Sequence, residues 1–165
     1  MTNREGQVER IGFTGHQGLT DRTTVRVGAE INKFLSEHEK IVGFCSLAEG
    51  ADQLFANALI EHGGQLVAVI PCENYESTFT DSHTLDKYRS YLSAAAKTIQ
   101  LDYPEPNEDA FWGAGKKVVE QSNTIIAVWD GKNSKGLGGT GDVVKYAREL
   151  GKRVNIIWPP GSERK

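Results

Sequence analysis

The 165-residue sequence is 38% hydrophobic and carries 19 lysine and arginine residues against 22 aspartate and glutamate residues. This length predicts a single domain, residues 1–165, built around one hydrophobic core. The formal net charge of -3 provides no general positive field, so nucleic acid is an unlikely class of partner and phosphate recognition must be local.

Both ends of the chain are polar. Residues 1–8 lack the apolar core of a secretory signal, and no later run approaches the ~18 apolar residues of a membrane span, so we expect a cytoplasmic protein without a membrane partner. The segment 160–165 is expected to be a frayed tail. Cys45 and Cys72 end apolar runs without metal-ligand spacing, which predicts reduced, structural thiols, no metal site and no cofactor.

Strand-like and helix-like segments alternate along the chain. Short apolar runs predict strands at residues 11–14, 41–46, 65–70, 98–101, 124–129 and 154–158. Apolar residues at helical spacing predict helices around residues 27–35, 51–59, 85–96, 110–118 and 143–150, the first of them capped by Thr20 or Asp21. This order predicts an α/β fold: a Rossmann-like, doubly wound, mostly parallel sheet of about six strands with helices on both faces.

Ligands of such sheets bind at the carboxyl ends of the strands, where the strand order reverses. A first loop at these ends contains Gly12, Thr14, Gly15, His16 and Gln17. Its glycines allow close backbone approach to a ligand, and its polar side chains supply donors. A tight strand-to-helix turn without a ligand is the competing interpretation.

The second loop runs from Ser46 to Asp52. Gly50 and Ala51 precede the clearest helix and could present backbone N–H groups to a phosphate. Ser46 and Glu49 also fit a capping box, in which Asp52 would favour the helix dipole without any ligand. Both interpretations remain open for this loop.

The third loop joins a strong strand to a helix and is rich in glycine. Its candidate residues are Asp130, Gly138, Gly139, Thr140, Gly141 and Asp142. Thr140 as the N-cap, with two glycines ahead of it, predicts a backbone cradle for an oxyanion, and a mobile surface loop is the alternative. The loop lacks the Gly-Lys-Ser/Thr end of a Walker A motif, which argues against kinase and GTPase functions.

Together these three loops resemble, in order, the nucleotide-facing regions of the SLOG superfamily. This superfamily is named for the DNA-processing (DprA/Smf) proteins and the lonely-guy phosphoribohydrolases, and the resemblance runs from Ile11 to Trp158. It implies a Rossmann-like fold and nucleotide binding. The glutamate of the lonely-guy Pro-Gly-Gly-x-Gly-Thr-x-x-Glu loop aligns with Val143, and the nearest acid is Asp142.

The leading functional hypothesis is binding of a nucleotide or nucleotide derivative by these glycine-rich loops. The alternative is a hydrolase or transferase of an N-glycosidic bond, with Glu49 or Asp142 as the catalytic carboxylate. Tyr75, Trp112 or Trp129 is expected near the base, and the connection 72–84 is a candidate lid. A homo-oligomer is also compatible with these hypotheses.

Overall fold

The computed structural model describes residues 7–165, so residues 1–6 of the expected polar tail lie outside the described part. One parallel six-stranded sheet has the order β4-β3-β2-β1-β5-β6. The strands are β1 (Val8–Gly15), β2 (Lys40–Cys45), β3 (Gln65–Ile70), β4 (Lys97–Gln100), β5 (Thr124–Val128) and β6 (Arg153–Ile157). The helices are α1 (Asp21–Ser36), α2 (Ala51–Glu61), α3 (Ser82–Ala94), α4 (Glu108–Glu120) and α5 (Thr140–Glu149), with a short 3-10 helix η1 (Tyr75–Thr78).

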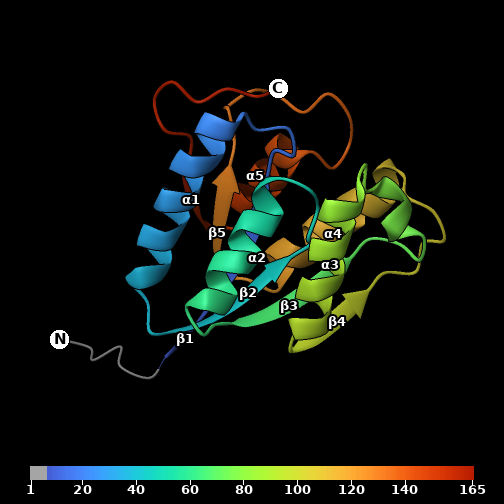
Figure 1. Cartoon of the computed structure of the whole chain (residues 1–165), viewed down its shortest axis with the longest axis horizontal. Coiled ribbons are helices and arrows are strands. Elements are labelled where there is room, and N and C mark those ends of the chain that lie inside the picture. Colours follow the sequence, from blue (N-terminus) through green and yellow to red (C-terminus); the bar gives the residue numbers. More distant parts are fainter. Residues whose placement is uncertain (1–6) are drawn as a thin grey trace.

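The sheet is doubly wound, as the sequence predicts. Helix α2 packs against α1 and α3 on one face, and α4 packs against α5 on the other (Figure 1). After β4 at one edge the chain returns through α4 to β5, which pairs with β1. The order of the strands therefore reverses between β1 and β5, and a ligand crevice is expected at their carboxyl ends.

Helix α1 forms where the capping and apolar patterns agree. The hydroxyl oxygen of Thr20 accepts a hydrogen bond from the Thr23 N–H at 3.3 Å, which confirms Thr20 as the cap. Val27, Ile31 and Leu35 form the buried stripe that faces the sheet. This helix anchors the loop that leaves β1.

Helix α2 begins against the end of β1. The Phe13 and Phe55 rings stack with centroids 4.6 Å apart, which places α2 over the strand. A Cβ atom on Gly15 would lie 2.6 Å from the Cβ of Ala51, so only glycine permits this approach. The first and second loops are thereby brought into contact.

The two chain ends differ from the sequence prediction. Val8 already belongs to β1, so the described end of the polar tail is shorter than expected. The predicted fraying of residues 160–165 is wrong, because the Lys165 N–H donates to the Gly18 carbonyl at 2.7 Å and the Thr20 N–H donates to the Glu163 carbonyl at 3.3 Å. These backbone hydrogen bonds hold the segment against the loop after β1, and a polar composition gives no sign of them.

Within residues 7–165, no helix combines the length and apolar character needed to cross a bilayer. Cys45 and Cys72 are buried free thiols, as expected.

Candidate functional site

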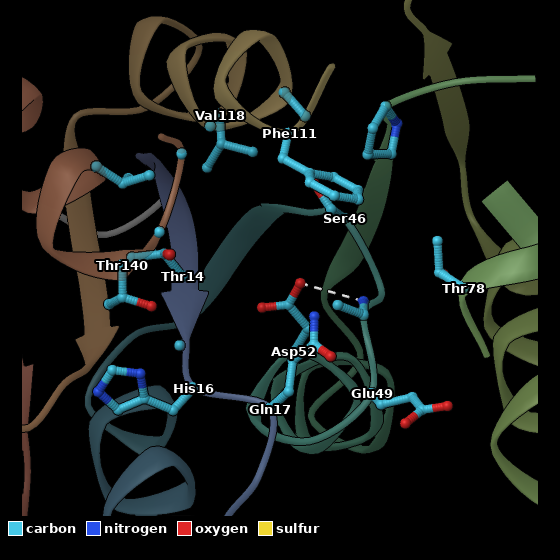
Figure 2. Close-up of a pocket in the computed structure, with 18 of the residues that line it drawn as sticks. Thr14, His16, Gln17, Ser46, Glu49, Asp52, Thr78, Phe111, Val118 and Thr140 are labelled. Carbon is cyan, nitrogen blue, oxygen red and sulfur yellow. Dashed lines mark hydrogen bonds between the residues drawn. The ribbon is translucent and has the colours of Figure 1, made fainter. Parts of the chain in front are cut away.

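A cleft of about 520 Å³ opens at the carboxyl ends of the central strands, between α2 on one side and α4 and α5 on the other (Figure 2). Ten of the predicted site residues line it: Thr14, Gly15, His16, Gln17, Ser46, Glu49, Asp52, Gly138, Gly139 and Thr140. The cleft therefore brings residues of all three loops together.

Five predicted site residues do not line this cleft: Gly12, Gly50, Asp130, Gly141 and Asp142. Gly12 lies within β1, where a Cβ atom would meet the Ser122 hydroxyl at 2.6 Å, so this glycine serves packing. Gly141 faces the neighbouring loop, because a Cβ atom added to it would lie 3.2 Å from the Lys132 carbonyl oxygen. The other three contact lining residues: Gly50 approaches Gln17, Asp130 pairs with Arg164, and Asp142 accepts a hydrogen bond from Gly138.

His16 connects the ends of β1 and β5. Its N–H donates to the Val128 carbonyl at 3.1 Å, and its ring Nε2 accepts from the Asp130 N–H at 3.0 Å. Because Nε2 accepts, the proton of the neutral ring lies on Nδ1. Burial and the nearby Arg164 guanidinium lower the pKa of His16, so the ring is neutral at pH 7.

Asp130 holds a cation at the cleft. Burial alone would raise the pKa of Asp130, but the Lys132 N–H and the Arg164 guanidinium lower it. Its carboxylate lies 3.6 Å from the Arg164 guanidinium. Asp130 therefore positions Arg164, which lines the cleft, rather than facing a ligand itself.

The second loop does not form the predicted capping box. Helix α2 begins at Ala51 with Gly50 as the N-cap, and no side chain caps it. Ser46 lies too early in the chain to be the cap. The Glu49 carboxylate instead accepts hydrogen bonds from the Thr80 N–H and from the Thr84 hydroxyl at 3.0 Å. Glu49 thus ties the start of α2 to the connection 72–84.

We expect Glu49→Ala to lower the free energy of unfolding by about 1–3 kcal/mol, because the donors of Thr80 and Thr84 lose a charged acceptor. Protease cleavage near residue 80 should increase. Urea unfolding and limited proteolysis would measure both effects, with Glu30→Ala, an exposed change on α1, as the control. Unchanged stability and cleavage would show that this tether contributes nothing.

Asp52 forms part of the cleft floor, and only 7% of its surface is exposed. Its Oδ2 accepts a hydrogen bond from the Ala48 N–H at 3.2 Å. Burial raises the pKa of Asp52 from its ordinary value of 3.8 to about 7, although backbone N–H groups of Ala48 and Ser46 lower it. This carboxyl can therefore exchange a proton near neutral pH.

The third loop is held together by Asp142, whose carboxylate accepts from the Gly138 N–H at 3.0 Å. Asp142 faces a separate depression beside Ser134, so the structure does not bring this catalytic candidate to the cleft. Gly139 is the N-cap of α5, and Thr140, predicted as the cap, is its first residue. Within residues 7–165 the backbone N–H groups of Gly139 and Thr140 meet no acceptor.

The wall opposite α2 is apolar. Helix α4 contributes Phe111, Ala114 and Val118, and Figure 2 shows Phe111 and Val118 above the cleft. Of the three aromatic residues expected near a base, only Tyr75 lines the cleft. The ring N–H of Trp129 donates to the Lys132 carbonyl in another depression.

The ring centroid of Trp112 lies 5.6 Å from that of Tyr146, and Trp112 does not line the cleft. Phe111, its neighbour in sequence, lines it instead. Phe111, Glu108 and Arg164 also line the cleft and were not among the predicted site residues. The period of α4 could have indicated Phe111, because it stands at i, i+3 and i+7 spacing with Ala114 and Val118 on one helix face.

The chain is thus a Rossmann-like α/β protein with its cleft at the strand switch point. Among solved structures, it resembles DNA processing protein A (DprA) from Streptococcus pneumoniae, with 18% identity and a TM-score of 0.68 over 93% of this chain and 52% of that one. This chain therefore spans about half of the pneumococcal protein. DprA from Helicobacter pylori, described with a single-stranded DNA binding mode, matches with 12% identity and a TM-score of 0.67, covering 94% of this chain and 68% of that one.

The molybdenum cofactor binding protein from Rippkaea orientalis matches with 16% identity and a TM-score of 0.58, covering 92% of this chain and 77% of that one. No protein-family model matches the sequence, and no curated protein matches it by sequence. The Rossmann-like fold that the SLOG resemblance implies is confirmed, since these solved structures share it. Identities this low establish the fold alone, so the expectation that nucleic acid is an unlikely partner stays a prediction.

Proposed function

We propose that the cleft binds a small molecule that joins a phosphate to a flat heterocyclic ring, such as a nucleotide or nucleotide derivative. The observation that carries this proposal is the presence of an oxyanion end and an apolar wall in one cavity. The volume of about 520 Å³ suits a ligand of this size.

The oxyanion end combines three kinds of donor. The N–H groups of Gly139 and Thr140 begin α5, where the helix dipole favours an anion. The Nδ1–H of His16 and the guanidinium of Arg164 lie among the same lining residues. Among the cleft-lining residues that the structure describes, Arg164 is the one lysine or arginine. A phosphate would therefore prefer the end of the cleft where Arg164 lies.

Two of the similar solved structures are described by a ligand that they bind. One solved structure of this fold is described as a molybdenum cofactor binding protein, and another as a protein that binds single-stranded DNA. One of these ligands is a polyanion and the other is a small molecule. This chain has a formal net charge of -3, so it has no general attraction for a polyanion. We therefore favour the small ligand over the nucleic acid.

We expect Arg164→Gln to weaken binding of AMP and GMP by about 10-fold or more, because a charge-assisted contact to phosphate is lost. The tail should remain in place, since it is held by backbone hydrogen bonds of Glu163 and Lys165. Thermal shift and calorimetry with these nucleotides would measure the effect. Arg148→Gln, an exposed change on α5 outside the cleft, is the matched control.

The same samples should be tested with adenosine, guanosine and a single-stranded oligonucleotide, and analysed for released base. Nucleosides should bind more weakly than nucleotides if phosphate is recognised. Equal nucleotide binding by Arg164→Gln and the parent would contradict the proposed oxyanion end. Release of free base would instead support the N-glycosidic-bond hydrolase.

A further inference from the structure

The floor of the cleft offers one carboxyl group for direct contact with a ligand. Figure 2 shows the carboxyl of Asp52 pointing into the cleft, with Thr14 and Thr140 on one side and Glu49 on the other. Its dashed bond joins Oδ2 to the Ala48 N–H. That N–H fixes Oδ2 as an acceptor, so the proton of the neutral carboxyl resides on Oδ1 and ionisation frees Oδ1 to accept.

The carboxylates of the cleft are not equivalent. Glu49 already accepts hydrogen bonds from Thr80 and Thr84. Glu108 stands at the N-terminus of α4 beside the glycine-rich loop. Asp52 is the buried one, and the donors that face its carboxyl are the backbone N–H groups of Ala48, at 3.2 Å from Oδ2, and of Ser46.

The titratable groups that face Asp52 do not neutralise it. Cys45 of β2 and Tyr75 of η1 have their pKa values raised well above the ordinary range, first by burial and next by Asp52. His16 after β1 is neutral at pH 7, and Arg164 pairs with Asp130. Ionised Asp52 therefore lacks a cation, and donors from a ligand would stabilise it.

Building on the proposed function, we propose that Asp52 reads the edge of the heterocycle, and that this edge presents two adjacent N–H donors. The 2-amino-4-oxopyrimidine ring, which guanine and pterin share, has such an edge. The ionised carboxylate offers lone pairs on Oδ1 and a remaining lone pair on Oδ2, and the ring N–H and amino group supply two matching donors.

An adenine edge fits the ionised carboxylate less well. Adenine presents one donor and one ring-nitrogen acceptor, which match the neutral carboxyl, but once Asp52 is ionised the ring nitrogen faces a carboxylate oxygen. Two electron-rich atoms opposed in a buried site are unfavourable. Helix α2 strengthens the selection, because Asp52 lies in its first turn, where the helix dipole favours the ionised form that pairs with two donors.

Binding of such a ring removes the proton from Oδ1 of Asp52 to solvent and leaves the carboxylate paired with the ligand. The proton is therefore released to the buffer. Asp52→Asn keeps the shape of the side chain and an oxygen to accept from Ala48, but its amide group opposes one of the two ligand donors. This change should abolish the preference for the donor edge and the proton release together.

The test compares GMP, IMP, AMP and neopterin monophosphate by calorimetry at pH 8.5, where the Asp52 carboxyl is ionised, and repeats GMP at pH 7 in two buffers that differ in ionisation enthalpy to detect the released proton. The parent should bind GMP or the pterin at least about 10-fold more tightly than AMP, with IMP, which lacks the amino group, in between. Whichever of GMP and neopterin monophosphate binds more tightly identifies the preferred ring as guanine or pterin. Asp109→Asn, on α4 outside the cleft, should keep the selectivity.

Equal binding of AMP and GMP, both weakened by Arg164→Gln, would overturn this inference and leave the proposed function standing. Retained selectivity in Asp52→Asn, or no proton release on GMP binding to the parent, would also overturn it. If none of the four probes binds the parent, the proposed function itself fails, and this inference with it.

Discussion

Asp52→Asn is expected to stabilise the ligand-free protein at pH 8 and to remove a loss of stability that the parent shows between about pH 4 and pH 7. The carboxyl has its pKa raised from 3.8 to about 7 by burial, so the folded state binds the proton more tightly than the unfolded state. Stability is therefore undiminished below pH 3.8, falls as pH rises to about 7, and then stays constant. Each unit of pKa shift corresponds to ~1.4 kcal/mol, which makes the effect large.

Urea unfolding of variant and parent from pH 5 to pH 8.5 would measure it as a difference. The difference matters because His16, whose pKa is lowered, makes the parent less stable as pH falls and so acts in the opposite direction. Asp109→Asn on the exposed start of α4 should keep the slope of the parent. An Asp52→Asn curve parallel to the parent across this range would mean that the buried carboxyl does not exchange its proton near neutral pH.

Most of the fold could be predicted because the local signals agree with the global arrangement. The apolar run at 65–70 is β3, buried on both faces, and the spacing of Val27, Ile31 and Leu35 marks the buried side of α1. Strands that alternate with helices leave few topologies when crossovers are right-handed. The carboxyl ends of β1, β2 and β5 had to meet, so the three loops could be placed at one site.

The roles of single side chains could not be predicted in the same way. Asp142 and Asp52 each lie near the start of a helix and accept a hydrogen bond from the backbone N–H four residues earlier, yet only Asp52 lines the cleft. Arg164 reaches the cleft only because the tail pairs with Gly18 and Thr20. These contacts join residues far apart in the sequence, and neither periodicity nor composition contains information about them.

Gly50→Ala is expected to lower the free energy of unfolding by at least about 3 kcal/mol. Gly50 has φ +88° and ψ -128°, a backbone conformation that residues with a Cβ rarely adopt. A Cβ there would also lie 2.6 Å from the Cα of Gln17 and would collide with its carbonyl oxygen. Both neighbouring atoms belong to the backbone, so they cannot move aside as a side chain does, and the contact between the first and second loops must open.

Differential scanning calorimetry should then show a midpoint lower by about 6 to 12 °C for a chain of this size. Gly28→Ala is the matched control, because nothing lies within 4 Å of its Cβ position in α1. That change should raise stability by about 0.5–1 kcal/mol through helix propensity. If Gly50→Ala unfolds at the same temperature as the parent while Gly28→Ala shows its gain, the close approach of Gly50 to Gln17 does not exist in solution. The presence of glycine at position 50, which no capping box explains, would then need another structural explanation.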